Sequence, residues 1–227
     1  MSTQPAEPIA QLDDTATVSI PVADFSPSEM YVFLRDAVVP RPIAWITSVS
    51  PEGVVNLAPF SCFTFVSNRP PLIGVTIGRK GTRRKDTGAN IHATQEFVIN
   101  IGDSAQMEQI HLSSTEHPPG VSEVDLLGLR TAPSIAIRCP RLADAPVAME
   151  CRLHRVVEFG VLGSEFIVGE IVQFHFREGL YRDGQVETAE LRPLCRLGGP
   201  NYATLGPIVA LKPIALTPRS AATPESS

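Results

Sequence analysis

The sequence predicts a mainly β fold, a β-barrel with a few peripheral helices. Short apolar runs rich in β-branched and aromatic residues are separated by Pro, Gly, Asn and Ser, which is typical of strands joined by turns. Residues 148–156 alternate apolar and polar side chains over most of their length, as a half-buried strand does. Helical segments are few and short, and many short strands with turn signals favour a barrel.

The first half of the chain carries two predicted helices and four predicted strands. Ser26 and Pro27 indicate a helix start, because a hydroxyl cap and a proline both favour the first turn. The strands are expected at residues 43–47, 62–66, 72–77 and 97–101. Asp86 or Thr87 is expected to cap a helix that runs to about Gln95.

The second half begins with a predicted helix capped by Asp103 and continues with a long connection. Residues 112–133 contain three prolines and no sustained period, and a connection this long in a compact domain is more often functional than idle. Further strands are expected at 135–138, 147–157, 166–176 and near Tyr181, with a short helix within 187–194. We expect one domain at 19–212 between flexible tails at 1–18 and 213–227.

Composition excludes several classes of protein. The 227 residues are 43% hydrophobic, which suffices for a substantial core, and the net charge of −5 argues against a nucleic-acid partner. No apolar stretch approaches the roughly 20 residues that cross a bilayer, and residues 1–14 lack the pattern of a secretory signal. We therefore expect a cytoplasmic protein without a membrane partner.

The cysteines and histidines show no metal-binding pattern. The four cysteines form no CxxC pair, so they are expected to be reduced thiols rather than disulfides or zinc ligands, and Cys62 is expected to be buried and inert. The five histidines have no ligand spacing; His117, in the long connection, is the one we select for contact with a substrate or nicotinamide. No side-chain nucleophile or paired-carboxylate pattern stands out, so no catalytic side chain is predicted.

A basic segment is the strongest local signal. Residues 78–87 combine five cations with hydroxyl side chains just before the predicted helix. Amides at a helix N-terminus favour an anion, and Arg or Lys adds charge-assisted hydrogen bonds. On composition alone, a solvated basic loop with an ordinary helix cap is the favoured explanation of the segment, because such loops are common.

Several motifs, in order over about residues 21–205, resemble the flavin reductase-like proteins and their flavoredoxin-like branch. The matching motifs are Arg41-Pro42-Ile43-Ala44-Trp45, Asn56-Leu57-Ala58-Pro59-Phe60-Ser61, Gly78-Arg79, Lys85-Asp86-Thr87 with Asn90-Ile91, Pro146-Val147-Ala148-Met149-Glu150-Cys151, Val168-Gly169-Glu170-Ile171-Val172 and Arg196-Leu197-Gly198-Gly199. The resemblance implies the FMN-binding split barrel, a Greek-key β-barrel, and a homodimer with FMN near the subunit interface.

The resemblance also assigns cofactor-binding residues. Lys85, Asp86 and Thr87 are expected to hold the FMN phosphate, with Arg79 as a second contact. The isoalloxazine ring is expected to lie against two segments, represented by Thr47, Ser48, Asn56, Ala58, Pro59, Ser61, Cys62 and Phe63. From the residues alone, Asn56 is equally a turn residue and Phe63 a core residue. Trp45 is expected to pack in the barrel rather than stack on flavin.

One departure from the family pattern concerns the electron donor. Short flavin reductases often carry Gly-Asp-His before the Val-Gly-Glu strand, whereas this chain has Gly163-Ser164-Glu165. Glu165 is therefore a predicted neighbour of the nicotinamide nucleotide that would repel its phosphates. Tyr202 is a predicted substrate contact that closes over the flavin, although an ordinary interface aromatic fits equally.

The resemblance implies an FMN oxidoreductase in which NADH or NADPH reduces the flavin and a monooxygenase or other acceptor receives the electrons. Three alternatives stay open: an electron-transfer flavoprotein reduced by a protein partner, an FMN enzyme acting directly on an organic substrate, and an interaction protein that has lost the cofactor. The intact Asn56 and Lys85 motifs disfavour the last.

Overall fold

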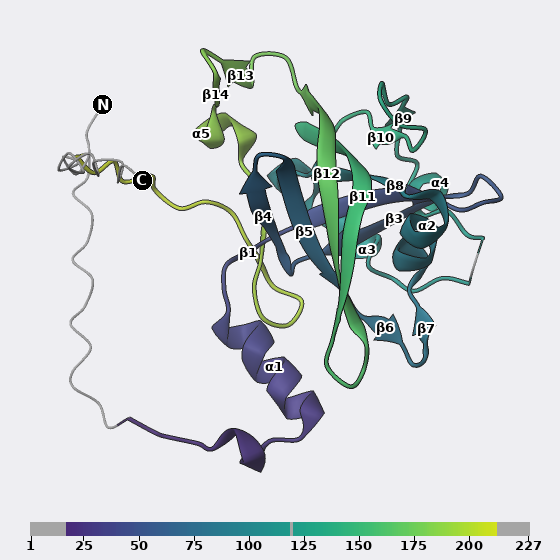
Figure 1. Ribbon diagram of the computed structural model, residues 1–227. Helices are drawn as coiled ribbons and strands as arrows, with labels where there is room; N and C mark the ends of the chain where they lie inside the picture. The colour runs from purple at the N-terminus through teal and green to yellow at the C-terminus, as the bar shows by residue number, and fades with distance from the viewer. Residues whose placement is uncertain (1–16, 119, 213–227) are drawn as a thin grey trace, which may run out of the picture.

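One antiparallel sheet of seven strands forms the body of the protein in the computed structural model, which describes residues 17–118 and 120–212 (Figure 1). The strand order is β3-β2-β8-β11-β12-β5-β4. The bounds are β2 (Ala44–Val49), β3 (Val55–Phe60), β4 (Phe63–Asn68), β5 (Pro71–Ile77), β8 (Glu96–Ile101), β11 (Val147–Phe159) and β12 (Ser164–Phe176). The predicted tails lie outside the described residues, apart from residues 17 and 18.

Nine short strands lie outside this sheet in the described part of the chain. They are β1 (Arg41–Pro42), β6 (Arg79–Lys80), β7 (Arg83–Arg84), β9 (Thr131–Ala132), β10 (Arg141–Leu142), β13 (Tyr181–Arg182), β14 (Gln185–Val186), β15 (Cys195–Arg196) and β16 (Tyr202–Ala203). The pairs β6–β7, β9–β10 and β13–β14 each form a two-stranded ribbon, and β1, β15 and β16 form a three-stranded sheet. This small sheet brings the C-terminal part of the domain against its N-terminal part.

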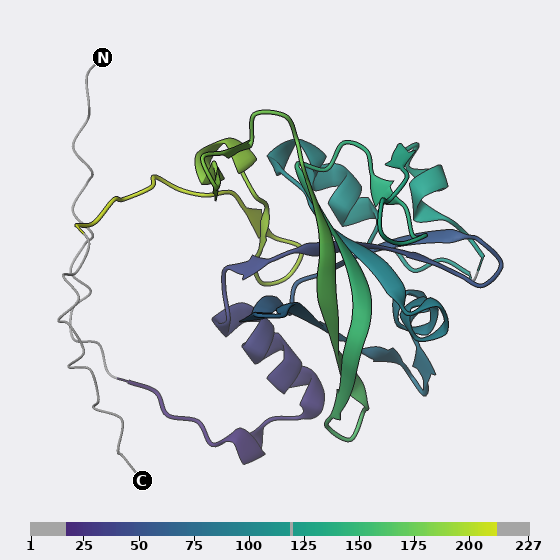
Figure 2. The ribbon, with the colours of Figure 1, turned by 45° about the horizontal axis from the view of Figure 1, so that its top comes forward.

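The helices are short and peripheral, as predicted. They are α1 (Pro27–Ala37), α2 (Asp86–Thr94), α3 (Met107–Leu112), α4 (Glu123–Leu126) and α5 (Thr188–Leu191), with 3₁₀ turns η1 (Val22–Asp24) and η2 (Ser104–Gln106). Helix α1 starts at the predicted place with a capping box between Ser26 and Glu29. In Figure 2, α1 (purple) lies at the lower left and α3 (teal) near the top.

The core lies between the strands and these helices. The largest cluster gathers apolar side chains of β2, β5, β8, β11 and β12, including the fully buried Phe97 and Ile167. Trp45 is also fully buried, in a second cluster with Leu57 and Ile110, and its indole N–H donates to Ser113. The prediction that Trp45 packs inside the fold is confirmed.

Two predicted elements differ from the structure. Residues 135–138 form no strand, because the amides of Ile135 and Ala136 donate to the fully buried carboxylate of Glu150 instead of to a neighbouring strand. Conversely, residues 55–60 form strand β3, which pairs with β2 over its whole length. A buried carboxylate thus replaces strand pairing in the first case.

No helix in the described ranges has the length and apolar character needed to cross a membrane. The described cysteines are free thiols, and burial raises the pKa of Cys139 to about 12. That thiol therefore stays protonated at neutral pH.

Replacing Gly169 by Ala should destabilise the fold. A Cβ at this position in β12 would lie 2.5 Å from Cζ of the buried Phe97. Overpacking of this kind costs typically about 1–3 kcal/mol of unfolding free energy, measurable by urea denaturation. The matched control is Gly206→Ala, since a Cβ there meets nothing within 4 Å. Equal stability of the two variants would contradict tight packing of Phe97 over Gly169.

Candidate functional site

The N-terminus of helix α2 faces a cavity and has no side-chain cap. Lys85, rather than the predicted Asp86 or Thr87, is the N-cap residue, and no side chain bonds to the first amides. The helix has nine residues, so its dipole adds to the attraction that these unpaired N–H groups exert on an anion. Lys85 itself is exposed beside them.

This cavity, called here the cradle, gathers three segments distant in the sequence. Strand β3 contributes one wall, the β6–β7 ribbon with the start of α2 the second, and the loop after α3 the third. The lining residues are Asn56, Ala58, Pro59, Phe60, Lys80, Arg83, Arg84, Lys85, Asp86, Thr87, Ser113, Ser114, Thr115, Glu116, His117 and Glu123.

Two buried hydrogen bonds join the cradle walls. The side-chain amide of Asn56 donates to the Thr87 hydroxyl over 2.9 Å, which ties β3 to the first turn of α2. The carboxylate of Glu123, 7% exposed, accepts from the Leu57 amide over 2.9 Å and ties α4 to the same strand. The polar groups that face the cavity are therefore preorganised by contacts across the fold.

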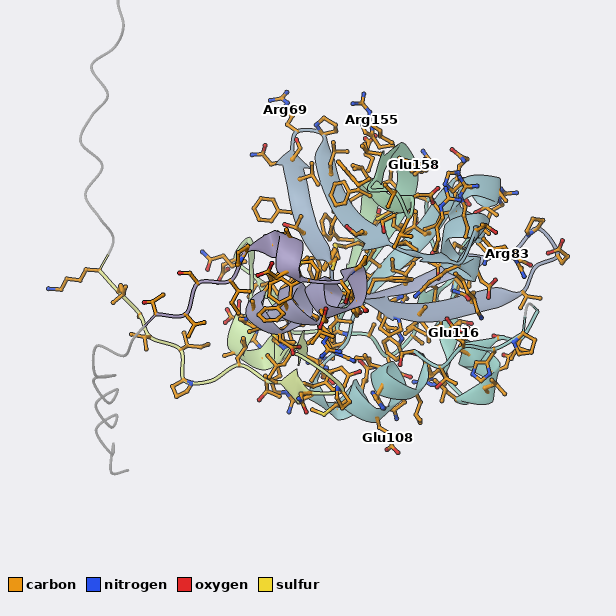
Figure 3. All side chains as sticks on the ribbon, turned by 90° about the horizontal axis from the view of Figure 1, so that it is seen from below. Arg69, Arg83, Glu108, Glu116, Arg155 and Glu158 are labelled. Atoms are coloured by element: carbon orange, nitrogen blue, oxygen red, sulfur yellow. The ribbon has the colours of Figure 1, made fainter. Side chains whose placement is uncertain are left out.

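The charges of the cradle are unevenly matched. Lys80 pairs with Glu116 at 2.8 Å, and Arg84 pairs with Glu165 at 2.8 Å. Arg83 and Lys85 make no ion pair with any carboxylate of the described ranges. Figure 3 shows Arg83 on the same side of the molecule as Glu116. An anion that enters the cradle meets two unmatched cations next to an uncapped helix.

The structure brings together seven of the predicted site residues: Asn56, Ala58, Pro59, Lys85, Asp86, Thr87 and His117 all line the cradle. Thr47 and Ser48 do not, since both are fully buried; Thr47 donates to the Pro140 carbonyl and Ser48 accepts from Asn90. Cys62 is exposed, which corrects the expectation of a buried thiol, and Phe63 packs against the core. Contact of these four residues with a flavin stays a prediction.

Glu165 faces inward, and its predicted place beside a nicotinamide nucleotide stays a prediction. Its side chain is 2% exposed and accepts from Arg84 at 2.8 Å and Arg79 at 3.3 Å, and it contacts His92 at 3.2 Å. Burial alone would raise the pKa of Glu165, but the Arg84 hydrogen bond and the Arg84 and His92 charges outweigh it and hold this pKa below its usual range. The carboxylate anchors the β6–β7 ribbon.

Arg79 is engaged in the same cluster. Its guanidinium donates to the Gly163 carbonyl and to Glu158 as well as to Glu165. It does not line the cradle. Its contribution to the site is therefore to hold the ribbon against β12, and direct contact with a phosphate stays a prediction.

Ser61 and Tyr202 line a second cavity that shares Pro59, Phe60 and Ser114 with the cradle. The Tyr202 hydroxyl lies within hydrogen-bond distance of Arg196 and, at 3.2 Å, of His111. Burial raises the pKa of Tyr202, against the opposing charge of Arg196, so the hydroxyl stays protonated at neutral pH.

From the loop wall of the cradle, sequence reasoning selected only His117 and missed the other polar residues. Ser113, Ser114 and Thr115 directly follow α3, and Glu123 begins α4 after the Ser122 cap. The available signal was the cluster of hydroxyls at 113–115 inside a long connection. Within the described ranges, no group of three or more His, Cys, Asp or Glu side chains is arranged to hold a metal ion.

Known proteins share this architecture. The structure of nitrilotriacetate monooxygenase component B from Bacillus cereus is 37% identical, with a TM-score of 0.84 over 87% of this chain and 100% of that one. The Pseudomonas fluorescens 2-nitrobenzoate 2-nitroreductase is 33% identical, with a TM-score of 0.81 over 90% of this chain and 100% of its own. An uncharacterized protein of Halalkalibacterium halodurans is 40% identical over 82% of this chain and 91% of its own.

The family model of the flavin reductase like domain matches residues 35–190. This range includes strand β3, the basic ribbon, helix α2 and the loop wall, which together make up the cradle. The chain belongs to the flavin reductase-like family and has its split-barrel fold.

Proposed function

We propose that this protein is an NAD(P)H-dependent FMN oxidoreductase that binds FMN in the cradle and supplies electrons to a separate acceptor, such as a monooxygenase. The observation that supports this most directly is the uncapped N-terminus of α2 beside Lys85 and Arg83, which offers a phosphate unpaired amides and unmatched positive charge. Asn56, Ala58 and Pro59 lie in the same cavity, where a flat ring joined to that phosphate would rest.

The fit to FMN follows from the chemistry of the two ends of the cradle. Lys85 and the first amides of α2 suit a dianionic phosphate, whereas the backbone of β3 and the Asn56 side chain supply the hydrogen-bonding groups that a flavin ring edge requires. The acidic side chains at the cavity are largely committed, since Glu116 pairs with Lys80 and Glu123 accepts from Leu57. The residues present therefore fit the cofactor.

The protein contributes placement rather than acid–base chemistry. Bound FMN supplies the hydride-accepting ring that side chains lack. Asn56 and Thr87 orient the ring and phosphate ends relative to each other, because their mutual hydrogen bond fixes β3 against α2. Glu165 and Arg79 keep the basic ribbon in place next to α2, and the loop with Ser114 and His117 forms another wall of the cradle.

The electron donor and acceptor are inferred from the family. NADH or NADPH is the proposed donor, and the similarity to nitrilotriacetate monooxygenase component B supports delivery of electrons to a partner monooxygenase. The free thiols of the described cysteines fit a cytoplasmic location. A direct reaction with an organic substrate is the second candidate, supported by the similarity to the 2-nitrobenzoate nitroreductase.

We also propose a homodimer. Helix α1 carries Tyr31, Val32, Phe33 and Leu34, all 42–67% exposed, and buries none of its residues. The edge strand β4 presents Phe65 at 82% exposure. Exposed apolar side chains on a helix and on a sheet edge are typical of a protein–protein interface. A second copy of the chain is the occupant that the family resemblance indicates.

Replacing Lys85 by Ala should weaken FMN binding on the order of tenfold or more, since a charge-assisted contact is worth roughly 1.5–3 kcal/mol. Riboflavin affinity should change little, because riboflavin lacks the phosphate. Flavin fluorescence quenching measures both affinities, and Lys212→Ala is a control with the same charge change. Equal affinity of the wild-type protein for riboflavin and FMN would reject the phosphate cradle.

Anaerobic stopped-flow mixing with NADH or NADPH should bleach the bound FMN. Dithionite provides the control that the flavin is reducible. Full bleaching by dithionite with none by millimolar NADH or NADPH would exclude the reductase and leave the electron-transfer or direct-substrate flavoprotein.

Light scattering should report a dimer, and Leu34→Glu together with Phe65→Glu should shift the mass towards a monomer, because buried charges without partners are costly at an interface. The matched control is Val161→Glu, a fully exposed apolar residue in the turn between β11 and β12. A monomeric wild-type protein that binds FMN tightly would show that one subunit supplies the whole site.

A further inference from the structure

Two arginines stand directly opposite each other on neighbouring strands. Strand β1 pairs with β15 in antiparallel register, with Arg41 opposite Arg196. Residues paired in this way point to the same face, and both side chains line the second cavity. Like charges directly opposite each other destabilise a strand pair, so this arrangement requires compensation.

Within the described ranges, neither arginine pairs with a carboxylate. The Arg41 side chain donates only to neutral oxygens: the carbonyls of Arg35, Val38 and Leu197 and the hydroxyl of Ser61. Arg41 is 8% exposed, and buried charges are normally paired. Arg196 likewise donates to the Tyr202 hydroxyl and the Gly199 carbonyl. The small sheet therefore holds two positive charges that no carboxylate of the described ranges pairs with directly. The nearby Asp36 is hydrogen-bonded to Arg35, and that bond and, to a lesser degree, the Arg41 charge lower its pKa.

Donor groups remain available for a ligand. A guanidinium has five N–H donors, and the bonds of Arg196 use Nη1 and Nη2 once each, leaving Nε and one N–H on each terminal nitrogen. The Arg196 guanidinium also lies over the Tyr202 ring, 4.6 Å from its centroid, which fixes its plane. A third arginine of the cavity, Arg35, is already paired with Asp36 at 2.8 Å. Arg196 is thus the side chain best prepared for a planar anion.

The location links this cavity to the flavin. It shares Pro59, Phe60 and Ser114 with the cradle, so a molecule in it would lie beside whatever occupies the cradle. Tyr31 and Tyr202 add aromatic walls on the other side. These surfaces suit a flat organic molecule that carries an anionic group.

We propose that this second cavity, called here the arginine cavity, binds the anionic group, a carboxylate or a phosphate, of the small molecule that exchanges electrons with the flavin. Arg196 and Arg41 supply the positive charge. Arg196 also supplies the planar set of N–H donors, and Tyr202 holds that guanidinium in position. This inference rests on the proposed function and deepens it, because it assigns the cavity that recognises the donor or organic substrate.

Calorimetric titration of the FMN-loaded protein tests the proposal with two probes, benzoate as a planar carboxylate and ADP-ribose as the phosphate-bearing part of a pyridine dinucleotide. The wild-type protein should bind at least one of them. Arg196→Gln should weaken that binding by roughly tenfold or more, the typical loss for a charge-assisted pair. The Arg196→Lys variant keeps the charge but loses the planar set of N–H donors, so its probe affinity should lie between those of the wild-type protein and Arg196→Gln. The probe that binds identifies an organic acid or a dinucleotide as the source of the anionic group.

The controls separate this proposal from the flavin assignment. Arg155→Gln removes an equal charge from an exposed position at the edge of the molecule (Figure 3) and should leave both titrations unchanged. FMN affinity should also be unchanged in Arg196→Gln. A wild-type protein that binds neither probe at millimolar concentration, or an Arg196→Gln variant that binds them equally well, would overturn the proposal. Should FMN itself fail to bind, the same titrations on the flavin-free protein still decide the arginine cavity.

If circular dichroism shows that Arg196→Gln does not fold, the Tyr202→Phe variant is used to test the proposal instead. It removes the hydroxyl that accepts from Arg196 while keeping the aromatic wall. Weaker probe binding with unchanged FMN affinity supports the proposal, and unchanged probe binding counts against it.

Discussion

The carboxylate of Glu165 connects three parts of the protein at one buried point. It sits on the long strand β12, accepts from Arg84 and Arg79 of the basic ribbon, and contacts His92 of α2. With 2% of its side chain exposed, it would be unstable as a charge without these partners. The cluster therefore holds the ribbon and the helix against the sheet, which places the N-terminus of α2 at the cradle.

The same principle of buried polar links recurs around the site. Asn56 joins β3 to α2 through Thr87, and Glu123 joins α4 to β3 through the Leu57 amide. Glu150 accepts from the loop amides of Ile135 and Ala136. Asn56 and Glu123 thus join regular elements that form walls of the cradle, whereas Glu150 fixes a loop, and each of these contacts is costly to lose.

The cradle and the arginine cavity share one wall, and each contains its own positively charged groups. The cradle has unpaired helix amides with Lys85 and Arg83, and the arginine cavity has Arg41 and Arg196. Between them stand Pro59 and Phe60 of β3 and Ser114 of the loop. Positive charge thus lies on both sides of a mostly uncharged partition, which suits a cofactor and a second molecule that are each anionic and must meet face to face.

The sequence by itself determined the features that depend on neighbouring residues. The mainly β class, the start of α1 at Ser26 and the concentration of positive charge around Lys85 all follow from local patterns, because turn residues, helix caps and charge runs act over a few positions. The order of motifs also identified the family that the comparisons then showed.

Only the tertiary structure decided which groups face each cavity. Every residue of β2 except Val49 is buried, so alternation did not reveal that Thr47 points to Pro140 rather than to the cradle. Nothing in the sequence indicated that Glu165 is buried against Arg79, Arg84 and His92, which come from other segments of the chain. Arg41 and Arg196 became one site only through the pairing of β1 with β15. Contacts between residues far apart in the chain leave no periodic trace in the sequence, because packing rather than local conformation brings them together.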